Sequence, residues 1–241
     1  MKKLFYFLTI FTLFFCTVSC SLAQETQKLY GNVEENLELV NTIGQKILKS
    51  NNLSDKIKFL VAEEDHVNAY ANIKDEVYIY RGLLKVVETE DELAGVISHE
   101  VGHIKNEHVK KQAFLQIIMK PITSSISYIT DKLWINKLAE YMGILTIMKV
   151  SRSAEYQADS TGADLMVKAG YNPLGMISVL NRITENQLDI ISTHPSGDKR
   201  LVHLYDYLSS NYAEQVKNGY PTKSYAEFKA YMDEVLKNRN K

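Results

Sequence analysis

The chain has 241 residues, a formal net charge of −1 at pH 7 and 45% hydrophobic residues, enough for one domain with a sizeable core. No strongly basic block is present, so nothing in the sequence indicates nucleic-acid binding. The only two cysteines are Cys16 and Cys20, which excludes a domain held together by disulfides.

The first 23 residues have the layout of a secretory signal peptide. Two lysines precede an uncharged apolar stretch at 4–18, which is short for a membrane span, and small residues follow it. Residues 21–23 fit a cleavage site, whereas the residues that end in Cys20 loosely match a bacterial lipobox and would leave Cys20 lipidated. The sequence therefore predicts export, to the periplasm or to a lipid anchor in the cell envelope, and a single domain over 24–241.

Helices are expected on either side of a short β segment. Apolar residues at helical spacing predict a helix over 33–48. Alternating apolar residues then predict strands over 57–62, 67–71 and 77–80, with a turn at 74–76 between the last two. The chain is thus expected to fold as a predominantly helical α+β protein.

The next predicted helix carries the most informative motif of the chain. It begins at a Thr-x-x-Glu capping box formed by Thr89 and Glu92. Residues 99–103 read H-E-V-G-H, an H-E-x-x-H pentad. Positions four apart lie on one face of a helix, so the two imidazoles can bind one zinc ion. Glu100 lies beside the first histidine, where its carboxylate can act as a general base.

A catalytic zinc site needs a third protein ligand in addition to His99 and His103. His108 follows His103 by five residues, which on a continuous helix rotates it about 140° away from the pair. It is therefore expected to be a helix-end residue or a partner of a ligand. Glu155 and Asp159 lie four residues apart, so Glu155 can complete the site while Asp159 hydrogen-bonds a ligating histidine. The alternative is a solvent-exposed acidic face.

The rest of the chain is expected to be helical. Apolar spacing predicts helices over 153–168, 174–187, 198–209 and 225–237. The stretch 113–150 is apolar in patches, but no uncharged run in it reaches the roughly 20 residues of a membrane span. We expect core or cleft helices there, with a peripheral apolar surface that touches membrane or substrate as the alternative.

Four ordered motifs together resemble the M48 family of zinc metallopeptidases. They are H-E-V-G-H-I followed by His108, S-R-x-x-E-Y-x-A-D at 151–159, N-A-Y-A at 68–71 with V-Y-I-Y-R-G-L-L at 77–84, and T-H-P-S at 193–196 with Arg200. The resemblance implies a zincin-like metallopeptidase domain with a small hairpin or sheet before the active-site helix. One departure is the turn at 73–76, where relatives often carry Pro and Gly.

The resemblance also implies a role for each residue of the site. One Zn²⁺ per chain is expected on three ligands, His99, His103 and Glu155. Glu100 is expected to be the general base and Asp159 to orient a ligand. His194 is the candidate donor to the oxyanion of the tetrahedral intermediate, with Arg200 as a second candidate and a purely structural His-Pro loop as the alternative.

The implied function is a zinc-dependent endopeptidase for proteins of the bacterial cell envelope, acting on misfolded or misassembled substrates. The strand at 68–71 could bind a peptide by β-augmentation, although a hairpin that serves only the core is the competing view. Membrane association is expected through a lipidated Cys20 or through the apolar stretch 113–150. Two other functions remain open: a zinc-binding chaperone or assembly factor with latent protease activity, and a structural exported domain with an accidental pentad.

Overall fold

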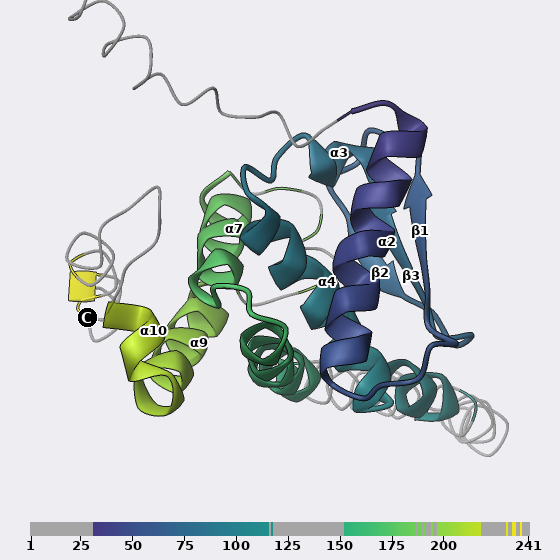
Figure 1. Ribbon diagram of the computed structural model, residues 1–241. Coiled ribbons are helices and arrows are strands. Elements are labelled where there is room, and N and C mark those ends of the chain that lie inside the picture. The colour runs from purple at the N-terminus through teal and green to yellow at the C-terminus, as the bar shows by residue number, and fades with distance from the viewer. Residues whose placement is uncertain are drawn as a thin grey trace, which may run out of the picture.

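The computed structural model describes residues 31–115, 152–186 and 197–217, together with 117, 188, 190, 194 and four isolated positions near the C-terminus (Figure 1). The predicted signal peptide at 1–23, nearly all of the apolar stretch 113–150 and most of the predicted helix over 225–237 lie outside these residues. No helix among the described residues is both long and apolar enough to cross a membrane.

The predicted strands form a three-stranded mixed sheet. They are β1 (Lys58–Ala62), β2 (Ala69–Ala71) and β3 (Glu76–Tyr80). The order is β1-β3-β2, with β1 parallel and β2 antiparallel to β3. The turn lies one or two residues earlier than predicted because Asn72 closes it. Its Oδ1 accepts hydrogen bonds from the backbone N–H groups of Lys74 and Glu76, at 2.9 and 3.1 Å.

The two faces of this sheet differ because side chains alternate along each strand. Phe59, Val77 and Ile79 are buried on one face. Tyr70 and Tyr78 are half-buried on the other, where their rings stack with centroids 4.9 Å apart. The helix α2 (Val33–Ser50) packs on β1, and α4 (Glu90–Lys105) packs on β2 and β3, so both helices cover the apolar face (Figure 1).

Both of these helices begin at capping residues. At α2, Asn32 and Glu35 form a reciprocal capping box that was not expected from the sequence. At α4, the Thr89 hydroxyl accepts a hydrogen bond from the Glu92 N–H at 3.2 Å, which is one half of the predicted capping box. The carboxylate of Glu92 is fully buried, and Arg182 donates two hydrogen bonds to it, at 2.6 and 2.9 Å. This ion pair ties the start of α4 to the helix that contains Arg182.

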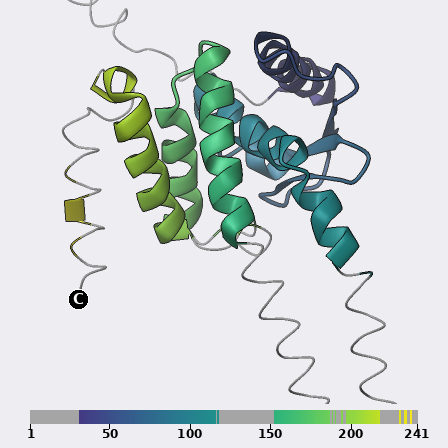
Figure 2. The ribbon, with the colours of Figure 1, turned by 90° about the horizontal axis from the view of Figure 1, so that it is seen from below.

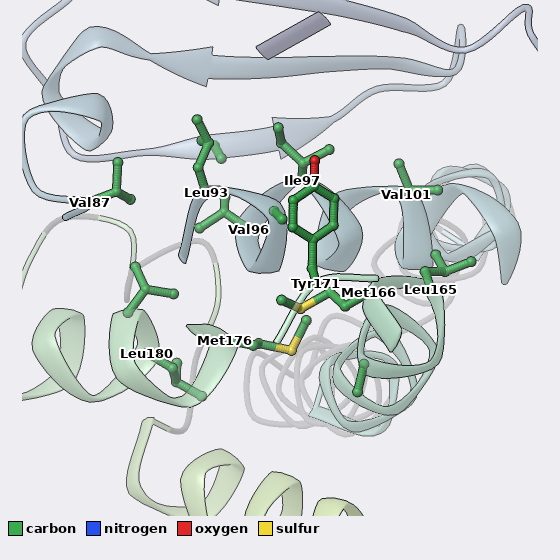
Figure 3. Close-up of a cluster of buried hydrophobic side chains, with 14 of the residues drawn as sticks. Val87, Leu93, Val96, Ile97, Val101, Leu165, Met166, Tyr171, Met176 and Leu180 are labelled. Carbon is green, nitrogen blue, oxygen red and sulfur yellow. The ribbon is translucent and has the colours of Figure 1, made fainter. Parts of the chain in front are cut away.

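The core lies on both sides of α4. Leu93, Ile97 and Val101 recur every four residues on its strand-facing side, as Figure 3 shows. Met166 and Met176 pack from the other side (Figure 3). The helices there are residues 152–168, α7 (Leu174–Glu185) and α9 (Gly197–Asn211). Figure 2 shows these three helices side by side.

Small residues on α4 allow this close packing. A Cβ atom on Gly102 would lie 2.8 Å from the carbonyl oxygen of Ala158, and one on Gly95 would lie 2.8 Å from Cα of Met176. The two glycines therefore permit the backbone of α4 to approach residues 152–168 and α7 closely.

The predicted helices 174–187 and 198–209 are present with shifted ends. The short helices α3 (Arg81–Leu84) and α10 (Ala213–Lys217) complete the labelled elements.

Candidate metal centre

The close packing of α4 on residues 152–168 brings His99, His103 and Glu155 together. Nε2 of His99 lies 3.1 Å from Nε2 of His103 and 3.3 Å from Oε2 of Glu155. Nε2 of His103 lies 3.4 Å from Oε1 of Glu155. The three residues are 3–7% exposed. The two histidines of the pentad therefore lie next to the carboxylate of Glu155, as predicted, in a nearly buried position.

His194 joins these three residues from the segment before α9. Its Nδ1 lies 3.0 Å from Oε2 of Glu155 and 3.3 Å from Nε2 of His99. Each of the four side chains offers one nitrogen or oxygen atom, and these atoms all lie within 4.8 Å of one another. Three come from the two packed helices, and His194 comes from the segment before α9.

The spacing of these atoms fits one metal ion. Zinc lies about 2.0–2.2 Å from nitrogen and oxygen ligands, so the ligand atoms around a tetrahedral ion are about 3.3–3.6 Å apart. Five of the six pairs among the four side chains lie 3.0–3.4 Å apart, and all four ligand atoms lie within 4.8 Å of one another. Imidazole nitrogens with one carboxylate are also donors that zinc accepts readily. Geometry and donor chemistry therefore agree on a site for a single ion.

Asp159 and Arg200 contact His99 and Glu155, two of the predicted ligands. Oδ1 of Asp159 lies 2.9 Å from Nδ1 of His99, which places the Nδ1 proton on the carboxylate side and leaves Nε2 free to bind metal. Arg200 donates two hydrogen bonds to Asp159, at 2.8 and 2.6 Å, and lies 2.9 Å from Oε2 of Glu155. Arg200 is 5% exposed, so these ion pairs lie in the interior of the protein.

The charges of this network are strongly coupled. Burial raises the pKa of Asp159, but the charge and hydrogen bonds of Arg200 outweigh it and hold that pKa well below the usual range. Burial and Arg200 lower the pKa of His99, yet hydrogen bonds to Asp159 and Glu155 raise it to about 9. The carboxylates of Asp159 and Glu155 are therefore ionised at neutral pH, and a metal ion that binds to His99 must displace a proton from its ring.

His108 lies beside the site as a partner of a ligand, one of the two roles expected for it, although the rotation on a continuous helix would have turned it away. α4 ends at Lys105, and Glu107 has a left-handed backbone with φ of 57°, so the helix is not continuous. Nδ1 of His108 consequently lies 3.1 Å from Nδ1 of His103, and its Nε2 lies 3.0 Å from Oε1 of Gln157. His108 is not in the group of possible ligands but contacts one of them. Sequence reasoning missed Gln157, because only the fold places it here.

Glu100 faces the open side of the site. It is 1% exposed, and its Oε1 lies 3.5 Å from Nε2 of His194. Both residues line a cavity of about 390 Å³, together with Tyr70 and Ala71 of β2. Nε2 of His194 also lies 3.4 Å from the carbonyl oxygen of Ala69 in that strand. In the described part of the sheet β2 is an edge strand, so its free edge borders the cavity beside Glu100.

Comparison with known proteins agrees with this geometry. Residues 34–208 match the model of peptidase family M48. The β-barrel assembly-enhancing protease of Yersinia pestis is 23% identical over 79% of this chain, and metalloprotease LoiP of Escherichia coli is 25% identical over 67%. The mitochondrial metalloendopeptidase OMA1 of Arabidopsis thaliana is 33% identical over 58% of this chain.

The coverage of these relatives is partial. The matched regions make up 41% of the Yersinia protein, 67% of LoiP and 29% of OMA1. The family model, however, spans most of this chain and includes the pentad, Glu155, Asp159 and His194. The predominantly helical fold with a small mixed sheet before the helix of the pentad is the predicted one. The chain therefore belongs to peptidase family M48, a family of zinc-dependent metallopeptidases.

Proposed function

We propose that the protein is a zinc-dependent endopeptidase that hydrolyses proteins of the bacterial cell envelope, with quality control of misfolded or misassembled proteins as its task. The observation that carries the proposal is the buried group of His99, His103, Glu155 and His194 with Glu100 beside it. The Yersinia relative is named as a protease that enhances β-barrel assembly, and this name supports the choice of envelope substrates.

Each residue of the site has its own role in the proposed reaction. His99, His103 and Glu155 would hold one zinc ion, which when bound polarises the scissile carbonyl and acidifies water. Glu100 takes a proton from the attacking water and passes it to the leaving amine. His194 lies within reach of both Glu100 and the metal position, so its imidazole can donate to the developing oxyanion. The fixed positions of these groups lower the barrier because little rearrangement is needed.

The free edge of β2 is the proposed substrate-binding strand. An extended peptide that pairs with Ala69–Ala71 would run along the cavity of about 390 Å³ and pass Glu100. Such pairing uses backbone hydrogen bonds, which ignore side-chain identity, and so suits a protease for unfolded chains. The proposal for the cellular site rests on the export signal expected at 1–23. A mass spectrum of the mature N-terminus would separate a free periplasmic protein from one lipidated at Cys20.

The direct test is degradation of casein by the zinc-loaded protein. Glu100→Gln should abolish cleavage while one zinc ion per chain is retained, because the amide cannot accept the proton. Glu90→Gln, an exposed residue in the first turn of the same helix, is the matched control and should cleave normally. If Glu100→Gln still prevents aggregation of unfolded clients and rescues a deletion strain, the chaperone function replaces this proposal.

A further inference from the structure

The outer face of the sheet, opposite α2 and α4, carries a row of side chains that crosses all three strands. The register pairs Leu60 of β1 with Tyr78 of β3, and Tyr78 with Tyr70 of β2. All three side chains are half-buried. The rings of Tyr70 and Tyr78 are nearly parallel, at 7°, and the ring of Tyr80 lies 6.1 Å from that of Tyr70. Because β2 is an edge strand of the described sheet, Tyr70 is the last ring of this row.

The pairing of β2 with β3 determines which backbone groups of β2 point to its free edge. Asn68 and Asn72, which flank β2, both hydrogen-bond to the backbone of β3, at 3.0 and 2.9 Å. In an antiparallel pair, residues that bond the partner strand alternate with residues whose backbone groups point the other way. The carbonyl of Ala69 and both backbone groups of Ala71 therefore point to the free edge. The distance of 3.4 Å from Nε2 of His194 to the Ala69 oxygen agrees with this direction.

A peptide that pairs with these groups would place one of its side chains against Tyr70. An antiparallel strand bonded to Ala69 and Ala71 has one residue directly opposite Tyr70, with Cβ atoms about 4.5–5.5 Å apart. Since side chains alternate along a strand, this side chain lies on the outer face, whereas those of its two neighbours lie on the opposite face. Tyr70 also lines the large cavity together with Glu100, so the paired residue lies near the reacting groups.

We propose that Tyr70 determines specificity by selecting an aromatic side chain at the substrate residue that pairs opposite it. The inference rests on the proposed peptidase function and on substrate pairing with β2. A ring at that position would extend the row of Leu60, Tyr78 and Tyr70 by one member, and aromatic cross-strand pairs are more stable than pairs with alanine. Aromatic side chains are mostly buried in folded proteins, so the preference favours unfolded chains as substrates.

Cleavage of a mixed peptide library by the zinc-loaded full chain tests this selection. At one fixed position from the cut, aromatic residues should give kcat/KM about three- to tenfold above alanine. Tyr70→Thr removes the ring but keeps a strand-forming residue, so this ratio should fall to about one, through KM and not kcat. Tyr70→Phe should retain the ratio because the ring remains. Tyr212→Thr, at a half-buried position between α9 and α10, is the matched control and should also retain it.

Binding without cleavage separates the role of Tyr70 from the peptidase function. Zinc-loaded Glu100→Gln is titrated by calorimetry with extended peptides that carry one phenylalanine at each position in turn. One of them should bind about three- to tenfold more tightly than the all-alanine peptide, and the gain should vanish when Tyr70→Thr is added.

This gain in affinity, in a protein whose wild type cleaves nothing, would refute the peptidase and leave the selection by Tyr70. Cleavage without an aromatic preference would overturn the selection and leave the peptidase. A preference that survives Tyr70→Thr, or equal binding of all the peptides, would likewise overturn the selection.

Discussion

Oδ1 of Asp159 lies 2.9 Å from Nδ1 of His99, and Asp159 is fully buried. The contact joins residues 152–168 to α4 through the far nitrogen of a metal ligand. Arg200, which lies on α9, donates two hydrogen bonds to the same carboxylate. One buried carboxylate thus couples three helices to the orientation of one imidazole, and the predictions below follow from such couplings.

Asp159→Asn should weaken zinc binding by about 10- to 100-fold, the usual effect of losing the partner of a metal-binding histidine. The amide preserves the shape but removes the charge that keeps the Nδ1 proton of His99 in place and neutralises Arg200. Competition with a chromophoric chelator measures the affinity. Asp55→Asn, at an exposed position, is the matched control. Equal affinity in both variants would show that Asp159 does not orient His99.

His108→Ala should also weaken zinc binding, by about tenfold. With metal on Nε2 of His103, the Nδ1 of that ring carries a proton, which His108 can accept at 3.1 Å. Gln157 in turn fixes His108 by accepting from its Nε2–H at 3.0 Å. Gln157→Ala should therefore give a smaller loss in the same chelator assay. The relay is refuted if both variants bind zinc as tightly as the wild type.

His194→Ala should lower kcat by about 10²- to 10³-fold, the usual effect of removing one donor to an oxyanion. Three protein ligands remain, so the zinc content should stay at one ion per chain. Steady-state kinetics and metal analysis on the same samples provide both numbers. A loss of zinc in this variant would make His194 a required ligand, and an unchanged kcat would exclude it as the donor.

Removal of zinc should lower the thermal midpoint by about 5–15 °C. An ion at 100 to 1,000 times its dissociation constant stabilises the folded state by about 3–4 kcal/mol, and 1 kcal/mol shifts a domain of this size by about 2–4 °C. Without the ion, the buried ligands His99, His103 and Glu155 lose their common partner. Calorimetry with and without chelator measures the shift, and readdition of zinc should restore the midpoint. Equal midpoints would argue against a bound ion.

Gly102→Ala should destabilise the fold by about 1–3 kcal/mol and weaken zinc binding. The added methyl group would lie 2.8 Å from the carbonyl oxygen of Ala158, so α4 and residues 152–168 must separate. That movement would carry Glu155 away from His99 and His103. Denaturant unfolding and the chelator assay measure the two effects. A variant of normal stability and zinc affinity would show that the helices can separate without cost to the site.

Much of the site could be predicted from local spacing. The pentad places His99 and His103 on one helical face regardless of the rest of the fold, and Glu155 and Asp159 share a face for the same reason. The strands and the helices α2, α4, α7 and α9 were also found close to their predicted positions, because apolar periodicity follows from which face each element buries.

His108 contacts a ligand, one of its two expected roles, but it does so by a route that helix geometry did not predict. The rotation of about 140° assumed an unbroken helix. Glu107 adopts φ of 57°, a conformation that its sequence neighbours do not signal, and the chain turns back toward His103. The contacts of Arg200 could not be predicted from local spacing either. Its partners Asp159 and Glu155 lie 41 and 45 positions earlier in the chain, and the packing of α9 brings Arg200 to them.

The sequence by itself determined which side chains can carry the chemistry, because residue type and helical spacing are local properties. Tertiary structure alone decided how they combine. It joined His194 to the three predicted ligands and turned Arg200 inward onto Asp159 and Glu155. Those outcomes depend on how closely α4, residues 152–168, α7 and α9 approach one another, and that distance is set by packing between residues remote in the chain.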